Sequence, residues 1–245
     1  MFVNEKKILI IRLRVHILFN MNKQRMEFSS DRRIENYLES IFTQCNITFM
    51  KDSEKGKTAY TFFADKDAKD SLITGVLVNF YKMKELISAL GEKDERAFDA
   101  LLGALIGFGQ EEDKEKIEKA LRKADVVNLD GFYNFLLDEV REDWNNLALL
   151  SSKLYAQCET EEDVYALSIF MLGMDDTINA VMIMDSAQRL FWEKSGTGIE
   201  IVPYYGNKER DTIITILSHR PSDVVVKDPS VVPESVLSVI KSLGE

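Results

Sequence analysis

Three aspartates near residue 180 are the residues whose type and spacing come closest to a metal site. Asp175, Asp176 and Asp185 flank the apolar segment "TINAVMIMD". Carboxylate oxygens are ligands that Mg²⁺ prefers, so a cluster of these side chains would suit a metal-dependent hydrolase. Aspartates at the ends of a strand also serve ordinary turns and caps. The second interpretation is favoured, and no bound metal and no cofactor are expected.

Few other residues could carry out chemistry. His16 and His219 are too few and too far apart in the sequence for a zinc site. Cys45 and Cys158 lack a CxxC neighbour, so we expect free thiols in a reducing compartment. The glycine-rich segment "SGTG" (195–198) matches neither dinucleotide-binding nor phosphate-loop spacing and predicts a turn between strands. The sequence therefore predicts no enzymatic activity.

The composition of the chain limits which class of molecule can be its partner. The chain has 245 residues, of which 45% are hydrophobic and 29% are charged, a balance that supports one continuous globular unit with a buried core. Its formal net charge of -10 repels phosphate backbones, so nucleic acid is not an expected partner. The exception would be a basic patch formed by Arg32, Arg33 and the N-terminal arginines.

The N-terminal segment "KKILIIRLRVHILF" (6–19) needs a separate interpretation. Arg12, Arg14 and His16 interrupt its apolar residues, so it predicts neither an export signal nor a membrane span, and a cytoplasmic location is expected. The alternation over 11–17 is typical of a half-buried strand. The alternative is a disordered or mis-started leader over 1–20, with the true start at a later methionine.

Hydrophobic periodicity predicts an α+β fold in three regions. An N-terminal region (1–66) contains a β-hairpin, a central region (67–174) is mainly helical, and a C-terminal region (175–245) holds a mixed sheet covered by helices. In the N-terminal region we expect a helix at 30–44 and a hairpin of "NITFM" and "TAYTFFA" around a turn at 51–57. In the central region we expect helices at "DSLITGVLVNFYKMKELISAL", "DERAFDALLGALIGF" and "EEDKEKIEKALRKAD". In the C-terminal region we expect a hairpin of "TINAVMIMD" and "RLFWEK", a strand at "IEIVPYY", a helix at "DTIITILSHR" capped by Asp211, a buried strand at "DVVVKD" and a closing helix at "ESVLSVIKSL".

Two of these helices carry finer expectations. Gly103 and Gly107 let a neighbouring element approach the second helix of the central region closely. The third is a solvated helix with ion pairs four residues apart, namely Glu112 with Lys116, Glu115 with Lys119, and Glu118 with Arg122. The alternative is a docking surface for a basic partner.

The string "NLDGFYNFLLDEVREDW" (128–144) predicts the start of one helix of about 25 residues. Asp130 or Asn128 caps it, and its apolar stripe consists of Phe132, Leu136, Val140, Trp144, Leu147, Leu150 and Leu154. Four residues remain as candidates for an exposed contact with a partner: Tyr133, Asn134, Tyr204 and Tyr205.

The segment "NLDGFYNF" resembles the YtxC-like sporulation protein family. The likeness continues through "INAVMIMDSAQRLFWE", "DTIITILSHRP", "SDVVVKD" and "ESVLSVIKSL", covers about residues 70 to 243, and is best at 128–135 and 212–228. The family has a basic residue soon after the second Phe, where this chain has Leu136 and Leu137, so an anion contact there would be lost.

The resemblance implies a role in endospore formation and no known reaction. We therefore expect a cytoplasmic sporulation-associated protein that acts through contacts with an unidentified protein partner. The alternative is a metal-dependent hydrolase that uses the aspartates around 175–185.

Overall fold

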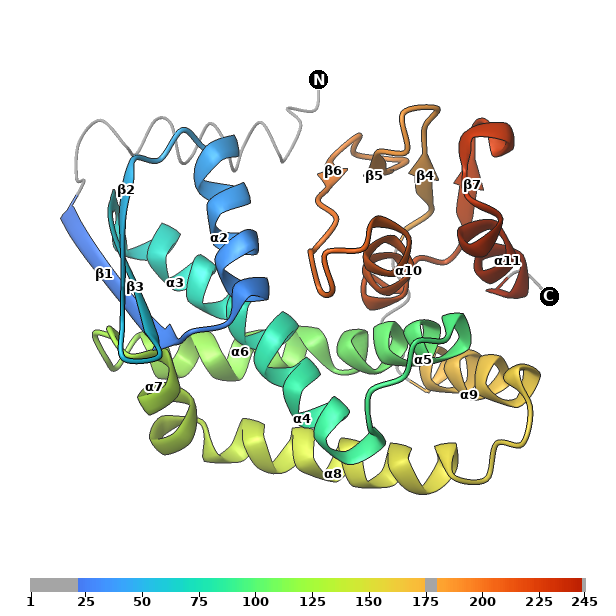
Figure 1. The fold of residues 1–245 in the computed structure, drawn as a ribbon, viewed down its shortest axis with the longest axis horizontal. Helices are drawn as coiled ribbons and strands as arrows, with labels where there is room; N and C mark the ends of the chain where they lie inside the picture. Colours follow the sequence, from blue (N-terminus) through green and yellow to red (C-terminus); the bar gives the residue numbers. More distant parts are fainter. Residues whose placement is uncertain (1–21, 175–179, 244–245) are drawn as a thin grey trace. The chain divides into compact units, whose positions relative to one another are not determined.

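The computed structural model describes residues 22–174 and 180–243, which form an α+β fold in two compact units. Unit 1 comprises residues 22–81 and 111–143, and unit 2 comprises residues 82–110 and the described residues from 144 onward (Figure 1). The expected fold class is confirmed. The helical region expected at 67–174 contributes to both units.

Unit 1 contains an antiparallel sheet in the order β1-β3-β2. Its strands are β1 (Asn22–Ser29), β2 (Phe49–Glu54) and β3 (Lys57–Ala64). The expected hairpin is confirmed, but its strands extend into the segment expected as a turn. Lys55 and Gly56 both have positive φ, at 53° and 77°, so they form a two-residue turn whose twist matches that of the strands. The strand expected at 11–17 lies outside the described residues.

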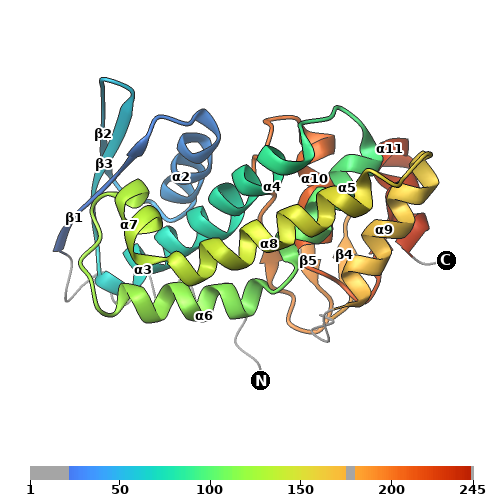
Figure 2. The same ribbon diagram turned by 90° about the horizontal axis from the view of Figure 1, so that it is seen from below.

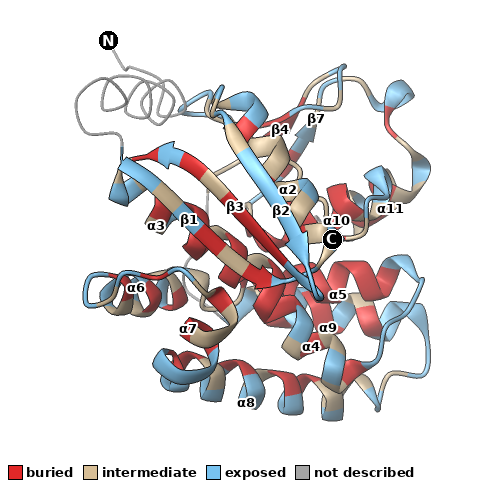
Figure 3. Ribbon diagram, turned by 60° about the vertical axis from the view of Figure 1, so that its left-hand side comes forward, coloured by how far each residue is buried: buried red, intermediate tan, exposed pale blue. Residues whose placement is uncertain are grey.

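Helix α2 (Arg32–Gln44) covers this sheet, as the sequence predicts. The side chain of Asp31 accepts a hydrogen bond from the backbone N–H of Arg33 at 2.9 Å and so caps the helix. The ring of Phe42 packs against the rings of Tyr60 and Phe62, with centroids 5.7 and 5.0 Å away. Figure 3 shows buried residues along β3, which is central in the sheet, while β2 is mostly exposed. The aromatic core of unit 1 therefore lies between α2 and the sheet.

The remaining elements of unit 1 are helical. They are α3 (Lys66–Val76), the π-helical turn η1 (Leu77–Tyr81), α6 (Gln110–Leu121), α7 (Leu129–Leu136) and the first turns of α8 (Asp138–Tyr155). Figure 2 shows α6 beside the start of α8, with α7 leading into α8. The expected solvated helix is α6, in which Ile117 and Leu121 are buried.

Unit 2 packs helices on a four-stranded mixed sheet in the order β6-β5-β4-β7. Its elements are α4 (Lys82–Leu90), α5 (Arg96–Gly107), the rest of α8, α9 (Glu161–Gly173), β4 (Met182–Met184), β5 (Leu190–Trp192), β6 (Gly198–Ile199), α10 (Lys208–Ser218), β7 (Val224–Val226), the 3-10 turn η2 (Pro229–Val231) and α11 (Glu234–Leu243). The hairpin β4–β5 and helices α10 and α11 confirm the sequence prediction. The expected strand "IEIVPYY" is confirmed only at its start.

One detail of this sheet differs from the expectation. Strand β7 pairs with β4 alone and forms an edge, so Val225 is exposed and the expected buried strand is wrong. Asp185 accepts hydrogen bonds from the backbone of Ala187 and Arg189 in the turn between β4 and β5. Residues 195–198 join β5 to β6, as expected for a turn between strands.

The two glycines of α5 confirm the predicted close approach. A Cβ atom at Gly103 would lie 2.7 Å from Cβ of Leu217 and 2.8 Å from the carbonyl oxygen of Ile214, both in α10. A Cβ atom at Gly107 would lie 2.6 Å from the carbonyl oxygen of Ser218. Helices α5 and α10 therefore meet backbone to backbone.

The start of α10 corrects the predicted cap. The helix begins at Lys208 and is capped by Asn207, whose side chain accepts hydrogen bonds from the next backbone N–H groups. Asp211 is buried inside the first turn and accepts a hydrogen bond from the backbone N–H of Tyr205 at 2.7 Å. It therefore holds the preceding loop rather than the helix start.

Replacing Asp211 with asparagine is expected to stabilise unit 2 at neutral pH. Burial raises the pKa of the Asp211 carboxyl from 3.8 to about 6, against the hydrogen bonds from Tyr205 and Gly206 and the nearby charge of Arg210, while the charge of Asp99 raises it further. Because the folded state holds this proton more tightly, the stabilisation is complete below pH 3.8 and is lost as the pH rises through 6.

At pH 7.5 the carboxylate therefore destabilises the fold, and an asparagine keeps the acceptor without the charge. We expect the variant to unfold with a free energy about 2 kcal/mol higher than the native chain at pH 7.5, and with a smaller gain at pH 4.5. Denaturant titrations at the two pH values measure both gains. An equal gain at both would show that the charge of Asp211 is not the cause.

Candidate functional site

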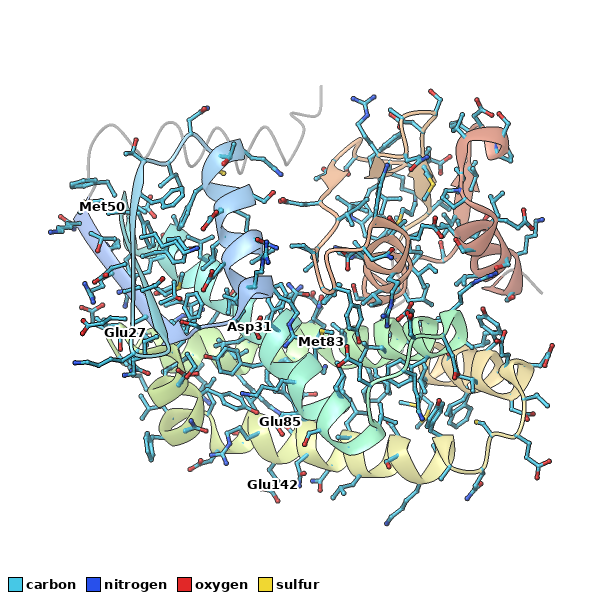
Figure 4. The ribbon with its side chains drawn as sticks, in the orientation of Figure 1. Glu27, Asp31, Met50, Met83, Glu85 and Glu142 are labelled. Atoms are coloured by element: carbon cyan, nitrogen blue, oxygen red, sulfur yellow. The ribbon has the colours of Figure 1, made fainter. Side chains whose placement is uncertain are left out.

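The string at 128–136 folds into the short helix α7, and its first residues fix it to strand β1. The side chain of Asn128 accepts a hydrogen bond from the backbone N–H of Gly131 at 2.7 Å, so Asn128 is the cap. The backbone N–H of Glu27 donates to the carbonyl of Val127 at 2.7 Å. Glu27 is labelled in Figure 4, and its carboxylate also lies 3.5 Å from the amide nitrogen of Asn128.

Asp130 does not cap the helix; its carboxylate accepts hydrogen bonds from residues that are distant in the sequence. Its Oδ2 atom accepts hydrogen bonds from the backbone N–H and the hydroxyl of Ser29, at 2.6 and 2.9 Å. Its Oδ1 atom accepts from the hydroxyl of Tyr81 at 2.6 Å. Burial and this hydrogen bond hold the pKa of Tyr81 above its usual range. One carboxylate therefore joins α7 to the end of β1 and to η1.

Tyr133 lies inside this joint. Its side chain is buried, its ring meets the ring of Tyr81 edge-on at 5.0 Å, and the guanidinium of Arg141 lies 5.7 Å from its centre. The expectation that Tyr133 is an exposed contact residue is therefore wrong. Asn134, the next residue, is exposed, and its carbonyl accepts a hydrogen bond from Arg141 at 2.7 Å.

The other two contact candidates belong to unit 2. Tyr204 is fully buried, so the expectation of an exposed contact is wrong for it as well. Tyr205 is half-buried under the guanidinium of Arg210, which lies 3.8 Å from its ring centre. Arg210 in turn binds the buried carboxylate of Asp99 at 2.8 Å. This cluster holds the loop before α10 against α5.

The helix expected over about 25 residues is interrupted at Leu137. This residue has φ −121° and ψ 37°, which ends α7, and α8 begins at Asp138. The interruption changes which residues face inward. Phe132, Leu137, Val140 and Trp144 are buried, whereas Leu136 and Leu150 of the expected stripe are exposed.

Two large apolar side chains project from the end of α7 as a result. Phe135 is 78% exposed and Leu136 is 57% exposed, although the helix that carries them is anchored at its other end. Phe135 lies three residues after the buried Phe132, and no local signal in the sequence marks it as exposed. The sequence prediction named neither residue as a contact site.

A groove of about 570 Å³ adjoins Leu136. Helix α6 and the turn that follows it form one wall, and the end of α7 with the start of α8 forms the other. We call it the docking groove; its apolar lining consists of Ala120, Ala124, Leu136, Leu137 and Val140, and its charged lining of Glu112, Glu115, Lys116, Lys119, Lys123 and Glu139.

Ion pairs hold one lysine of the docking groove, Lys116. Lys116 lies 2.7 Å from Glu112, 2.7 Å from Asp143 and 3.7 Å from Glu139, and the hydrogen bonds with Asp143 and Glu112 raise its pKa. The predicted ion pairs of Glu112 with Lys116 and of Glu118 with Arg122, at 3.8 Å, are confirmed.

The other two lysines of the groove are Lys119 and Lys123. Both are exposed, and neither forms an ion pair with any residue of the described part of the chain, so the predicted pair of Glu115 with Lys119 is wrong. Lys119 lies in the last turn of α6, and Lys123 lies in the turn that follows the helix. Charged side chains of both signs therefore line the docking groove beside its apolar residues.

The predicted metal candidates give no centre in the described residues. Asp185 is bound by the guanidinium of Arg189 at 2.6 and 2.8 Å, which lowers the pKa of its carboxyl. Asp175 and Asp176 lie outside the described residues. Within residues 22–174 and 180–243, no three His, Cys, Asp or Glu side chains are placed to share a metal ion.

Neither a search for membrane-spanning helices nor comparison with known proteins assigns a function to this chain. Among the helices that the structure describes, none combines the length and the apolarity needed to cross a bilayer. No family model, no curated protein and no solved structure matches this chain.

Proposed function

We propose that this protein serves endospore formation in the cytoplasm by binding a protein partner at the docking groove, without a catalytic step. The observation that carries the binding role is the exposure of Phe135 and Leu136 beside that groove. Exposed apolar side chains next to a concave surface are typical of protein contacts. The sporulation role rests on the resemblance of residues 128–135 to the YtxC-like family.

The anchoring of α7 supports this proposal. Asn128 and Asp130 fix the helix to β1 and η1, so Phe135 and Leu136 are presented from a backbone that is already ordered. A contact made from an ordered backbone costs less conformational entropy on binding. Asn128 and Asp130 both belong to the string that resembles the family, and their hydrogen bonds position the helix that carries the exposed pair.

Genetic complementation with a surface variant tests the proposal. Deletion of the gene in the native host is expected to leave growth unchanged and to lower the yield of heat-resistant spores. A Phe135→Ser, Leu136→Ser variant should melt like the native chain, because neither side chain is buried, yet fail to restore spore yield. Losing an exposed hot-spot side chain costs about 2 kcal/mol or more of binding.

The matched control replaces two other exposed apolar residues of unit 1, Met50 and Phe63, with serine. Met50 lies on the sheet, as Figure 4 shows, and the control variant should restore spore yield. An unchanged spore count after deletion would refute the sporulation role. Full complementation by the Phe135→Ser, Leu136→Ser variant would refute the docking surface.

A further inference from the structure

We infer that two copies of this chain associate through the open edge of β7, in an antiparallel and two-fold symmetric ladder centred on Val225. The inference concerns unit 2 and is independent of the docking groove. It depends on three features of β7: the backbone groups that point away from the sheet, the opposite charges at the two ends of the strand, and the exposed apolar side chain at its centre.

The backbone of β7 is free to pair on one side. The strand is paired with β4 alone, at one end of the sheet (Figure 1), and this ladder extends from the carbonyl of Asp223 to the N–H of Lys227. Because backbone groups alternate along a strand, those of Val224 and Val226 point away from β4. Within the described part of the chain, the N–H of Val226 and the carbonyls of both valines have no hydrogen-bond partner. The N–H of Val224 binds the carboxylate of Asp223 beside it, at 2.7 Å.

The other sheet edges of the described chain are less suited to a second copy. Strand β1 is bound along its second half, because Glu27 donates its N–H to Val127 and Ser29 donates its N–H to Asp130. Strand β2 carries charged side chains, including that of Asp52, along its exposed edge, and β6 offers only two residues. Charged side chains along an edge oppose pairing with another chain. Strand β7 consists of three valines instead.

The charges at the ends of β7 complement one another in such a pair. In an antiparallel ladder centred on Val225, Asp223 of each copy faces Lys227 of the other. Both side chains are exposed, and neither forms an ion pair within the part of the chain that the structure describes. Opposite charges at facing positions stabilise a pair of strands, and like charges destabilise it. A parallel arrangement would place like charges side by side, so the charges favour the antiparallel one.

The same register satisfies the outward backbone groups. Val224 of one copy faces Val226 of the other, and each N–H donates to the carbonyl opposite it. The N–H of Val224 exchanges the carboxylate of Asp223 for that carbonyl, which releases the carboxylate to bind Lys227 of the second copy. Because so short a ladder buries much less surface than a standard interface, we expect a dimer that dissociates in the micromolar range.

An apolar row across the sheet continues through this register. On the face opposite the side chains that pack on α10 and α11, Val225 lies beside Ile183 of β4, which lies beside Phe191 of β5. Val225 is 37% exposed, whereas Ile183, which has a neighbour on either side, is 7% exposed. At the two-fold axis the two copies of Val225 form a non-hydrogen-bonded pair, in which side chains lie close together. Pairing therefore buries the side chain that the open edge leaves exposed.

Charge reversal in the full chain tests the inference. Asp223→Lys places lysine opposite lysine in both pairs of the ladder, and Lys227→Asp places aspartate opposite aspartate. Each variant should therefore raise the dissociation constant of the dimer by about tenfold or more. The variant with both changes restores opposite charges and should dimerise like the native chain. Sedimentation velocity at loading concentrations from about 5 to about 500 µM, chosen for a weak dimer, measures the dissociation constants.

A mixture of the two single variants gives the sharpest readout. Asp223→Lys and Lys227→Asp chains in equal amounts should form a heterodimer, because both pairs across the ladder then join opposite charges. Misfolding of either variant would not be rescued by mixing. The matched control is Asp52→Lys, which makes the same change of charge at an exposed position of β2 and should dimerise like the native chain.

Several outcomes would overturn the inference. A native chain that stays monomeric at the highest concentration refutes it, and so does a dimer that persists in both single variants or that Asp52→Lys weakens equally. If the single variants dissociate and their mixture does not recombine, the facing of Asp223 and Lys227 is wrong. None of these results bears on the docking groove, which the Phe135→Ser, Leu136→Ser variant tests separately.

Discussion

Replacing Trp144 with alanine is expected to lower the free energy of unfolding of unit 2 by about 4 kcal/mol. The indole is 1% exposed, so its removal both loses apolar burial and leaves a cavity. The ammonium of Lys82, which is also buried, lies 5.9 Å from the centre of the indole ring and donates to the carbonyl of Phe108. The cavity would remove the aromatic face from this buried charge, which adds to the loss.

Guanidinium titrations followed by circular dichroism measure this effect. The matched control is Leu150→Ala in the same helix, α8. The sequence places Trp144 and Leu150 on one buried stripe, but in the structure Leu150 is 48% exposed. We expect the control to cost less than about 1 kcal/mol. Equal losses at the two positions would mean that α8 is rotated relative to the orientation described above.

The type of most elements could be predicted because their hydrophobic period is strong and local. Helix α5 is apolar almost all round, and α10 has a polar start and a proline after its end. The hairpin of β2 and β3 has a polar segment with a lysine–glycine turn between the runs "NITFM" and "TAYTFFA". Strand β1 could not be predicted in the same way, because only Met26 and Phe28 of its residues are buried.

The break between α7 and α8 has no local signal. No glycine or proline lies at Leu137, and the stripe from Phe132 to Leu154 fits one continuous helix. In the structure, burial of Leu137 and Val140 decides the conformation, as tertiary packing does when it overrides helix propensity. The exposure of Phe135 and Leu136, on which the docking surface depends, follows from this break and so could not be predicted.

Hydrogen-bond acceptors were misassigned for a related reason. Asp130 and Asp211 both stand where a helix cap would be expected, and both instead accept hydrogen bonds from other segments. Ser29, the donor to Asp130, is 101 residues away in the sequence. A local sequence pattern contains the acceptor but not its distant donor. The string at 128–136 could therefore be identified as unusual, but the role of Asp130 in binding Ser29 could not be predicted from it.

Replacing Gly103 with alanine is expected to destabilise unit 2 by about 3 kcal/mol, although alanine is the better helix former. The added Cβ atom would lie 2.7 Å from Cβ of Leu217 and 2.8 Å from the carbonyl oxygen of Ile214. The first is held directly by the backbone of α10 and the second is part of it, so neither can turn away as the end of a long side chain would. Helices α5 and α10 would have to separate, and their buried contacts with Ala100, Ile213 and Leu217 would loosen.

Gly173→Ala is the matched control, because it makes the same chemical change in α9 of the same unit. A Cβ atom there would have no neighbour within 4 Å, so only the gain in helix propensity remains. We expect this variant to be more stable than the native chain by about 0.5 kcal/mol. The two substitutions should therefore shift the denaturation midpoint in opposite directions. A Gly103→Ala chain as stable as the Gly173→Ala chain would show that α5 and α10 do not touch backbone to backbone.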